Sequence, residues 1–181
     1  YSLEMWHETN SQNDGTLRRE TQFPQSSEQW VLSGPHFFVG TPFYKTPRAE
    51  CTQNSHYDVL DLTDLPEDYL PRTNYVPACS PEEYDRRTPR VPWVEEGETE
   101  PRKVTEYYRF VNRELVGSSS ERTFNGAIMP KGAANIHTCI GTVFKSEAGL
   151  LKFAGVALSL LGDFFIKSTG TGHINKSWLD R

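Results

Sequence analysis

The sequence predicts an α+β fold, in which a mixed or antiparallel sheet carries a packed helix and the first half of the chain is rich in loops. Ten of the 12 prolines lie before residue 100, where they exclude long helices and central strands. Beyond that point, residues 104–116, 122–129 and 135–144 have the composition of strands. A run of apolar residues at helical spacing then follows Ser146. We expect one domain over residues 1–181, because 36% hydrophobic content over 181 residues suffices for a single core.

The first half supplies short elements between its prolines. Residues 30–32 and 36–39 are short apolar strands by composition, and residues 57–62 alternate as a half-buried strand does. Ser80 is a helix N-cap, followed by a first-position proline and a capping-box glutamate. We therefore expect a short helix that ends before Pro89.

The second half is more regular, with turns at 117–121 and 130–134 between its predicted strands. We expect the helix after Ser146 to be packed in the core and to carry no ligand. Residues 164–166 either continue this helix or form another strand, and we favour continuation. The expected buried stripe of the helix comprises Leu150, Leu151, Phe153, Ala154, Ala157, Leu158 and Leu161.

Charge divides the chain at about residue 100, beside a charged turn at 95–100. The net charge is −5, which is acidic for a protein that binds a polyanion. Residues 1–100 hold 8 Lys and Arg against 18 Asp and Glu, whereas residues 101–181 hold 11 against 6. The basic second half could face a polyanion while the acidic first half faces solvent or a neighbouring domain. An imbalance of this size also occurs in ordinary globular chains.

Cysteine usage and hydropathy suggest a cytoplasmic protein. Cys51, Cys79 and Cys139 are odd in number and widely spaced, which favours neither a disulfide framework nor a zinc site. The longest apolar run, 150–161, is interrupted by a lysine and is too short to cross a bilayer, so no membrane partner is expected. Because the chain starts at Tyr1 and not at Met, we expect it to be a piece of a longer polypeptide.

Arginines on the first predicted strand of the second half are candidates for binding phosphate or base edges. The period of two places Arg109 and Arg113 on one strand face. An arginine row suits phosphates or guanine. The alternative is a solvated face with cross-strand ion pairs, and spacing alone favours this alternative. Arg122 and Thr123 follow a serine-rich turn that either holds a phosphate or only joins neighbouring loops.

Further polar residues lie at the later turns. Asn135 and His137 would share one strand face, where they either touch a base or form the turn. Lys131 lies in the preceding glycine turn, and we expect it to contact phosphate, as Arg109 would. Base reading is assigned to Arg122, Asn135 and His173. Possible further contacts near the glycine-rich segment after the long helix are Lys167, Ser168 and His173.

These residues also carry a family resemblance. The run YRFVNRELVGSSSERTFNGAIMPKGAANIHT, followed by LLKFAGVALSLLGDFFIKSTGTGHI, resembles the target-recognition region of large adenine-specific DNA methyltransferases. Those include type IIG restriction-modification enzymes and phage-defence methylases. The likeness covers residues 107–181, and residues 30–48 and 57–77 resemble the entry segment of the same region in a narrower subset. The resemblance reverses the preference at Arg109 and Arg113, because the family has arginine at both positions.

The resemblance implies a module that reads double-stranded DNA beside a methyltransferase domain of the same polypeptide. S-adenosylmethionine would bind that domain, since no glycine-rich cofactor turn occurs here, and we expect no catalytic or metal-binding residues in this chain. Residues 39–44 resemble a catalytic Asn-Pro-Pro-Tyr loop, but Thr41 lacks the required side-chain carbonyl. The alternative is a non-catalytic protein-interaction or structural domain whose arginines are ion-paired. One continuous positive groove would favour DNA binding, and interspersed charges would favour the alternative.

Overall fold

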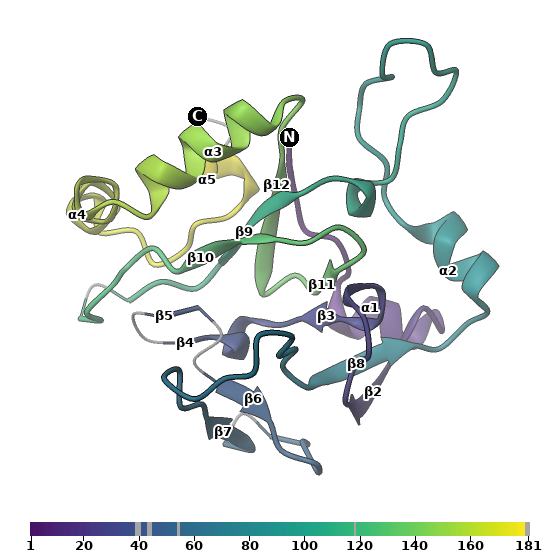
Figure 1. Cartoon of the computed structure of the whole chain (residues 1–181), viewed down its shortest axis with the longest axis horizontal. Helices are drawn as coiled ribbons and strands as arrows, with labels where there is room; N and C mark the ends of the chain where they lie inside the picture. Colours follow the sequence, from purple (N-terminus) through teal and green to yellow (C-terminus); the bar gives the residue numbers. More distant parts are fainter. Residues whose placement is uncertain (39–40, 43–44, 54, 118, 180–181) are drawn as a thin grey trace.

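A computed structural model describes residues 1–38, 41–42, 45–53, 55–117 and 119–179. Its main element is a four-stranded antiparallel sheet of order β1-β12-β9-β10, with α3 lying over one face (Figure 1). The α+β class predicted from the sequence is confirmed. The strands of this sheet are β1 (Ser2–Leu3), β9 (Arg109–Arg113), β10 (Gly126–Met129) and β12 (Cys139–Val143).

The remaining strands form two-stranded ribbons. One of them, between β3 and β11, is parallel and joins the first half of the chain to the second. The ribbons are β2 (Leu17–Gln22) with β8 (Thr73–Pro77), β3 (Val31–Leu32) with β11 (Ala134–Asn135), β4 (Phe37–Phe38) with β5 (Thr41–Pro42), and β6 (Lys45–Pro47) with β7 (Tyr57–Val59). The helices are α1 (Glu8–Asn13), α2 (Pro81–Arg87), α3 (Glu147–Ala157), α4 (Leu160–Thr169) and α5 (Lys176–Leu179), with 3-10 turns at Ser27–Gln29, Gly34–His36 and Val104–Glu106.

Both faces of the main sheet are buried. Phe110 on β9 packs with Leu150 of α3 in one hydrophobic cluster. Its neighbour Val111 packs with Trp30 and Leu32 of the first half in another. Because successive strand residues point to opposite faces, the helices cover one side of β9 and the first half covers the other. The arginines of β9 share the face of Val111.

Several predicted elements occur with shifted ends. The helix after Ser80 is confirmed as α2, and the Ser80 hydroxyl accepts a hydrogen bond from the Glu83 amide at 3.3 Å. The strand predicted over 104–116 is limited to β9, since residues 104–106 form a 3-10 turn that the Glu106 carboxylate caps at the Lys103 amide. The elements that the sequence did not predict are β1, β2, β5, β6, β8, α1 and α5.

The long helix predicted after Ser146 is broken into α3 and α4, whose axes differ by 68°. Ser159 caps α4 by accepting from the Gly162 amide at 3.0 Å. A Cβ at Gly162 would lie 2.1 Å from the Val156 carbonyl oxygen, so the turn requires glycine there. The expected continuation through residues 164–166 is therefore wrong as one helix, although these residues are helical.

The predicted buried stripe is also narrower than expected. Leu150, Ala154 and Ala157 are buried. Leu151, Leu158 and Leu161 are exposed by 62%, 44% and 82%, so the expected core role of these three leucines is wrong. Leu158 and Leu161 lie at or beyond the break between α3 and α4, whereas Leu151 lies within α3.

Candidate functional site

A cleft of about 250 Å³ lies where the two halves of the chain meet. The first half lines it with Glu8 of α1, Arg19 of β2, Tyr57 of β7 and two adjacent residues of β8. The second half contributes Arg113 at the end of β9 and the following Glu114. The cleft therefore exists only when both halves are folded together, and it brings charged and aromatic groups of both halves to one place.

Arg113 and Arg19 bring two guanidinium groups to this cleft. Arg113 is partly buried, and this burial lowers the pKa of its guanidinium. Arg19 is exposed at the rim. Among the described residues, no carboxylate lies within 4.0 Å of either guanidinium, and neither has a hydrogen-bond acceptor. A partly buried arginine normally finds an acceptor, so both groups are available to an anion.

Two tyrosines form the first-half wall. The Tyr75 hydroxyl donates to the Glu8 carboxylate, and the Tyr57 hydroxyl lies 3.4 Å from the Ser33 hydroxyl. Burial raises the pKa of Tyr57 to about 12, although the nearby charge of Arg19 acts in the opposite direction. Both phenols therefore stay neutral at physiological pH, and they offer the cleft aromatic surface with a polar edge.

Asn74 supplies an unsatisfied acceptor beside these tyrosines. Its side chain is buried, and its amide nitrogen donates to the Cys51 sulfur at 3.5 Å. Its carbonyl oxygen has no hydrogen-bond partner among the described residues. A buried acceptor without a donor is costly, so the Asn74 carbonyl oxygen is an unsatisfied polar atom beside the cleft.

Two predicted histidines each contact a glutamate of the cleft, although neither histidine lines the cleft. The His137 ring stacks on His7, and its Nδ1 accepts from the Glu8 amide at 3.2 Å. His173 is exposed, with Nδ1 3.5 Å from a Glu114 carboxylate oxygen, and its strand bridge with Leu115 holds it there. Arg113 itself lines the cleft, whereas His173 lines a separate hollow with Thr171 and Trp178.

Arg109 does not belong to this group, and the predicted exposed arginine face is wrong. Arg109 is 0% exposed and donates to the Ala133 carbonyl. Burial lowers its pKa to about 10. Because Met5 and Ala133 cover this end of β9, Arg109 cannot touch DNA as predicted, and it fills the interface between the two halves.

Three further predicted residues hold a loop onto α4. Arg122 donates to the Leu158 carbonyl at 3.0 Å and lies 3.5 Å from the Asp163 carboxylate. Thr123 is buried, and its amide donates to Asp163 at 2.8 Å. Lys167 donates to the Ser120 carbonyl at 3.2 Å. These contacts give the three residues a structural role. Ser118 of the predicted phosphate-binding turn lies outside the described residues.

The last predicted residues are dispersed. Asn135 is buried and donates to the Cys139 carbonyl at 2.9 Å, which excludes the predicted base contact in this structure. Ser168 donates to the Phe165 carbonyl within α4. Lys131 is exposed, with its ammonium 5.2 Å from the centre of the Tyr108 ring, and it lies apart from the cleft. Residues 39–40 and 43–44 of the segment resembling a methyltransferase loop lie outside the described residues.

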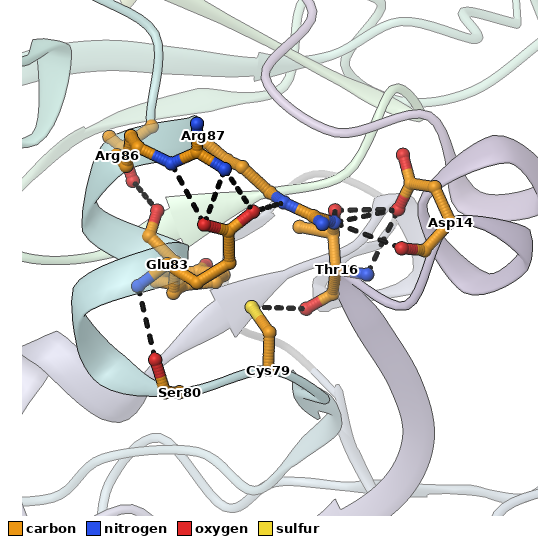
Figure 2. Close-up of polar contacts among 9 residues, drawn as sticks. Asp14, Thr16, Cys79, Ser80, Glu83, Arg86 and Arg87 are labelled. Carbon is orange, nitrogen blue, oxygen red and sulfur yellow. Dashed lines mark hydrogen bonds and ion pairs between the residues drawn. The ribbon is translucent and has the colours of Figure 1, made fainter.

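The arginines of α2 behave differently from those of the cleft. Figure 2 shows the Glu83 carboxylate between Arg86 and Arg87, with Arg87 reaching across to Asp14 and Thr16. The ion pair between Arg87 and Glu83 spans 2.6 Å, and Arg87 also donates to the Thr16 hydroxyl at 2.6 Å. This network joins α2 to the start of β2, and its acceptors are used within the protein.

Sequence reasoning missed Arg19 and Asn74. Arg19 lies in β2, whose residues Leu17–Gln22 are too polar to be identified as a strand. Asn74 lies in β8 between two prolines, a context that favours loops. The available indication was the Tyr75–Val76 pair, which is apolar and typical of strands.

Within the described ranges, no group of three His, Cys, Asp or Glu side chains is placed to hold a metal ion. No single described helix is long and apolar enough to span a bilayer, and the bent pair α3 and α4 meets the length and composition criteria only together. The chain matches no family model, no curated protein and no solved structure.

Proposed function

We propose that this chain is the DNA-recognition module of an adenine-specific DNA methyltransferase or restriction-modification enzyme that acts in phage defence in the cytoplasm. Its partner is double-stranded DNA. The methyltransferase domain of the same polypeptide would bind S-adenosylmethionine and methylate the base, while this module has no catalytic role of its own. The resemblance of residues 107–181 to target-recognition regions supports the assignment.

The observation that carries the proposal is the pair of arginines without acceptors at the cleft. A guanidinium offers parallel donors that match a phosphate, and such charge-assisted hydrogen bonds are the strong ones. In this account Arg113 and Arg19 hold the DNA backbone and set the position of the module. The arginines that the protein uses internally, Arg109 and Arg87, do not take part.

The acceptors of the cleft suit the base side of a nucleotide. Glu114 and the Asn74 carbonyl oxygen accept hydrogen bonds, and the exocyclic amines of cytosine and adenine are donors. His173, beside Glu114, can donate a ring N–H to a base or a phosphate. A cleft with both arginines and acceptors therefore fits a ligand that is anionic at one end and rich in N–H groups at the other.

Binding of the chain to short DNA duplexes at two salt concentrations tests the proposal. Arg113→Ala and Arg19→Ala should each weaken binding by roughly 10- to 100-fold and reduce the salt dependence by about one phosphate contact. Arg86→Ala is the matched control, because Arg86 is exposed and pairs with Glu83 outside the cleft. Equal losses in all three variants would mean that only net charge matters and would contradict the cleft assignment.

The second candidate function is a protein-interaction domain, and two observations favour it. Arg109 and Arg122 are engaged within the protein, and the cleft mixes arginines with glutamates in place of one continuous positive groove. Selection from a library of randomised duplexes discriminates between the candidates. An enriched DNA site supports the recognition module. If no DNA sequence is enriched and the recovery of duplexes does not depend on salt, the interaction domain is supported.

A further inference from the structure

The bent helix pair exposes a large apolar surface on the side turned away from the sheet. On α4, Leu160 and Leu161 are exposed by 79% and 82%, and Phe164 and Phe165 by 70% and 63%. In Figure 1, α4 is seen almost end-on at the edge of the molecule, beyond the sheet. We call this surface the helix-pair face, and it comprises Leu151, Val156, Leu158, Leu160, Leu161, Phe164 and Phe165.

The composition of α4 is that of a helix covered on two sides. Its inner side packs in the core, since Ile166 is buried in the cluster that contains Phe110 and Leu150. Its outer side repeats apolar pairs at positions 160–161 and 164–165, which form one stripe at helical spacing. A helix at a water-exposed surface normally presents polar residues outward, whereas an exposed apolar stripe is typical of an interaction surface.

The helix-pair face is fixed before any partner arrives. The 68° bend between α3 and α4 depends on Gly162, where any side chain would meet the Val156 carbonyl oxygen. The Ser159 cap and the contacts of Asp163 with the amides of residues 123 and 124 hold α4 in place. Little conformational entropy is therefore lost when the face is covered.

The charged groups of α4 do not compete for this face. Asp163 is buried beneath the helix, and Lys167 donates to the Ser120 carbonyl. Glu147 and Lys152 are the charged residues of α3, and they have opposite sign. A face that is apolar and nearly neutral is complementary to itself, as a two-fold contact requires.

We propose that a second copy of this chain covers the helix-pair face. From the exposed fractions of its seven side chains, the face presents on the order of 800 Å², which matches the area each partner buries in a standard stable interface. That area exceeds the largest apolar patches of typical monomers, which are about 300–600 Å². An antiparallel pairing of two α4 helices would bury the stripe of each against the other. The cleft with Arg19 and Arg113 has no lining residue from either helix, so both clefts of the dimer stay open.

Sedimentation velocity over a range of protein concentrations up to about 0.1 mM tests the proposal. The chain should sediment with twice its monomer mass at the upper concentrations and dissociate on dilution. Leu161→Glu and Phe164→Glu each place a charge at the centre of the face and should give monomers throughout. Val94→Glu is the matched control, because Val94 is 47% exposed and lies outside the helix pair. It should leave the dimer intact.

Thermal unfolding of the same variants separates loss of the dimer from loss of the fold. Both face variants should unfold cooperatively, because the replaced side chains make few contacts within the monomer. A wild-type chain that stays monomeric at every concentration would overturn the proposal, and so would a dimer that persists in both face variants. A monomer that cosediments with lipid vesicles would assign the face to a membrane surface and would likewise overturn it.

Discussion

Arg109 and Arg113 are identical residues on the same face of the same strand, and the protein uses them in opposite ways. Arg109 is completely buried between β9 and the first half of the chain, where it donates to the Ala133 carbonyl. Arg113, four residues further on, ends in the cleft without an acceptor among the described residues. Strand periodicity determines which face a side chain takes, whereas the segment packed over that face determines whether the side chain meets protein or ligand.

Substitution of the buried Arg109 should change the free energy of unfolding more than any other substitution proposed here. Arg109→Ala removes a long, fully buried side chain and should lower the free energy of unfolding by roughly 3–5 kcal/mol through cavity formation. Arg109→Met keeps most of the volume and removes a buried charge, so it should cost much less or even stabilise. Urea denaturation of both variants measures the difference. An Ala variant as stable as the wild type would mean that the Arg109 side chain is not buried in solution.

The same contrast between buried and exposed positions occurs on α3 and at its C-cap. Leu150→Ala should cost roughly 2–4 kcal/mol, because Leu150 is 3% exposed and packs with Phe110. Leu158→Ala should cost less than about 1 kcal/mol, since Leu158 is 44% exposed. Both are measured by denaturation at low protein concentration, where the chain is monomeric. Equal losses would show that Leu158 is buried in solution.

Paired and unpaired arginines should also separate by stability. Arg87→Ala should lower the free energy of unfolding by about 1–2 kcal/mol, because it removes hydrogen bonds to Glu83 and Thr16 that join α2 to β2. Arg113→Ala should change it by less than about 0.5 kcal/mol, since no protein acceptor is lost. DNA affinity should follow the reverse order. A large loss of stability in Arg113→Ala would assign that residue to the fold.

A pH-dependent effect concerns a buried histidine in the first half. His36 donates through Nε2 to the Arg72 carbonyl at 2.9 Å, and burial lowers its pKa below the ordinary 6.5. The folded protein therefore favours neutral His36, whose contribution to stability is present above pH 6.5 and is lost as the pH falls below it. The loss approaches about 1.4 kcal/mol per pH unit at most. Denaturation between pH 7.5 and 5.5 should show a shallower slope for His36→Gln than for the wild type, and identical slopes would contradict the role of His36.

Local patterns predicted the fold well where they were strong. The cap and proline at residues 80–81 located α2, and the α+β class followed from alternation in the second half. The helix break at Ser159 was missed because the apolar spacing runs through it, although Ser159 followed three residues later by glycine is a recognisable N-cap. Strands β2 and β8 were missed because pairing between distant polar segments, not local propensity, forms them.

The candidate site was predictable only in part. Arg113 was predicted as a binding residue and lines the cleft, whereas His173 lies outside it and contacts the cleft residue Glu114. Arg109 shares their sequence pattern, but the covering chain from residue 5 and residue 133 could not be foreseen from β9 alone. Arg19 and Asn74 reach the cleft through long-range pairing of β2 with β8. No pattern within either segment marks that juxtaposition.

The central claim is that Arg113 is open to an anionic ligand and Arg109 is not. Nitrogen-edited NMR of the arginine Nε–Hε groups during titration with a short DNA duplex tests it most directly. The Arg113 and Arg19 signals should shift with DNA concentration and saturate together, while those of Arg109 and Arg87 stay unchanged. The same shifts should weaken as salt is raised, because phosphate contacts release counterions. Saturable shifts at Arg109 or Arg87 with none at Arg113 would contradict the account.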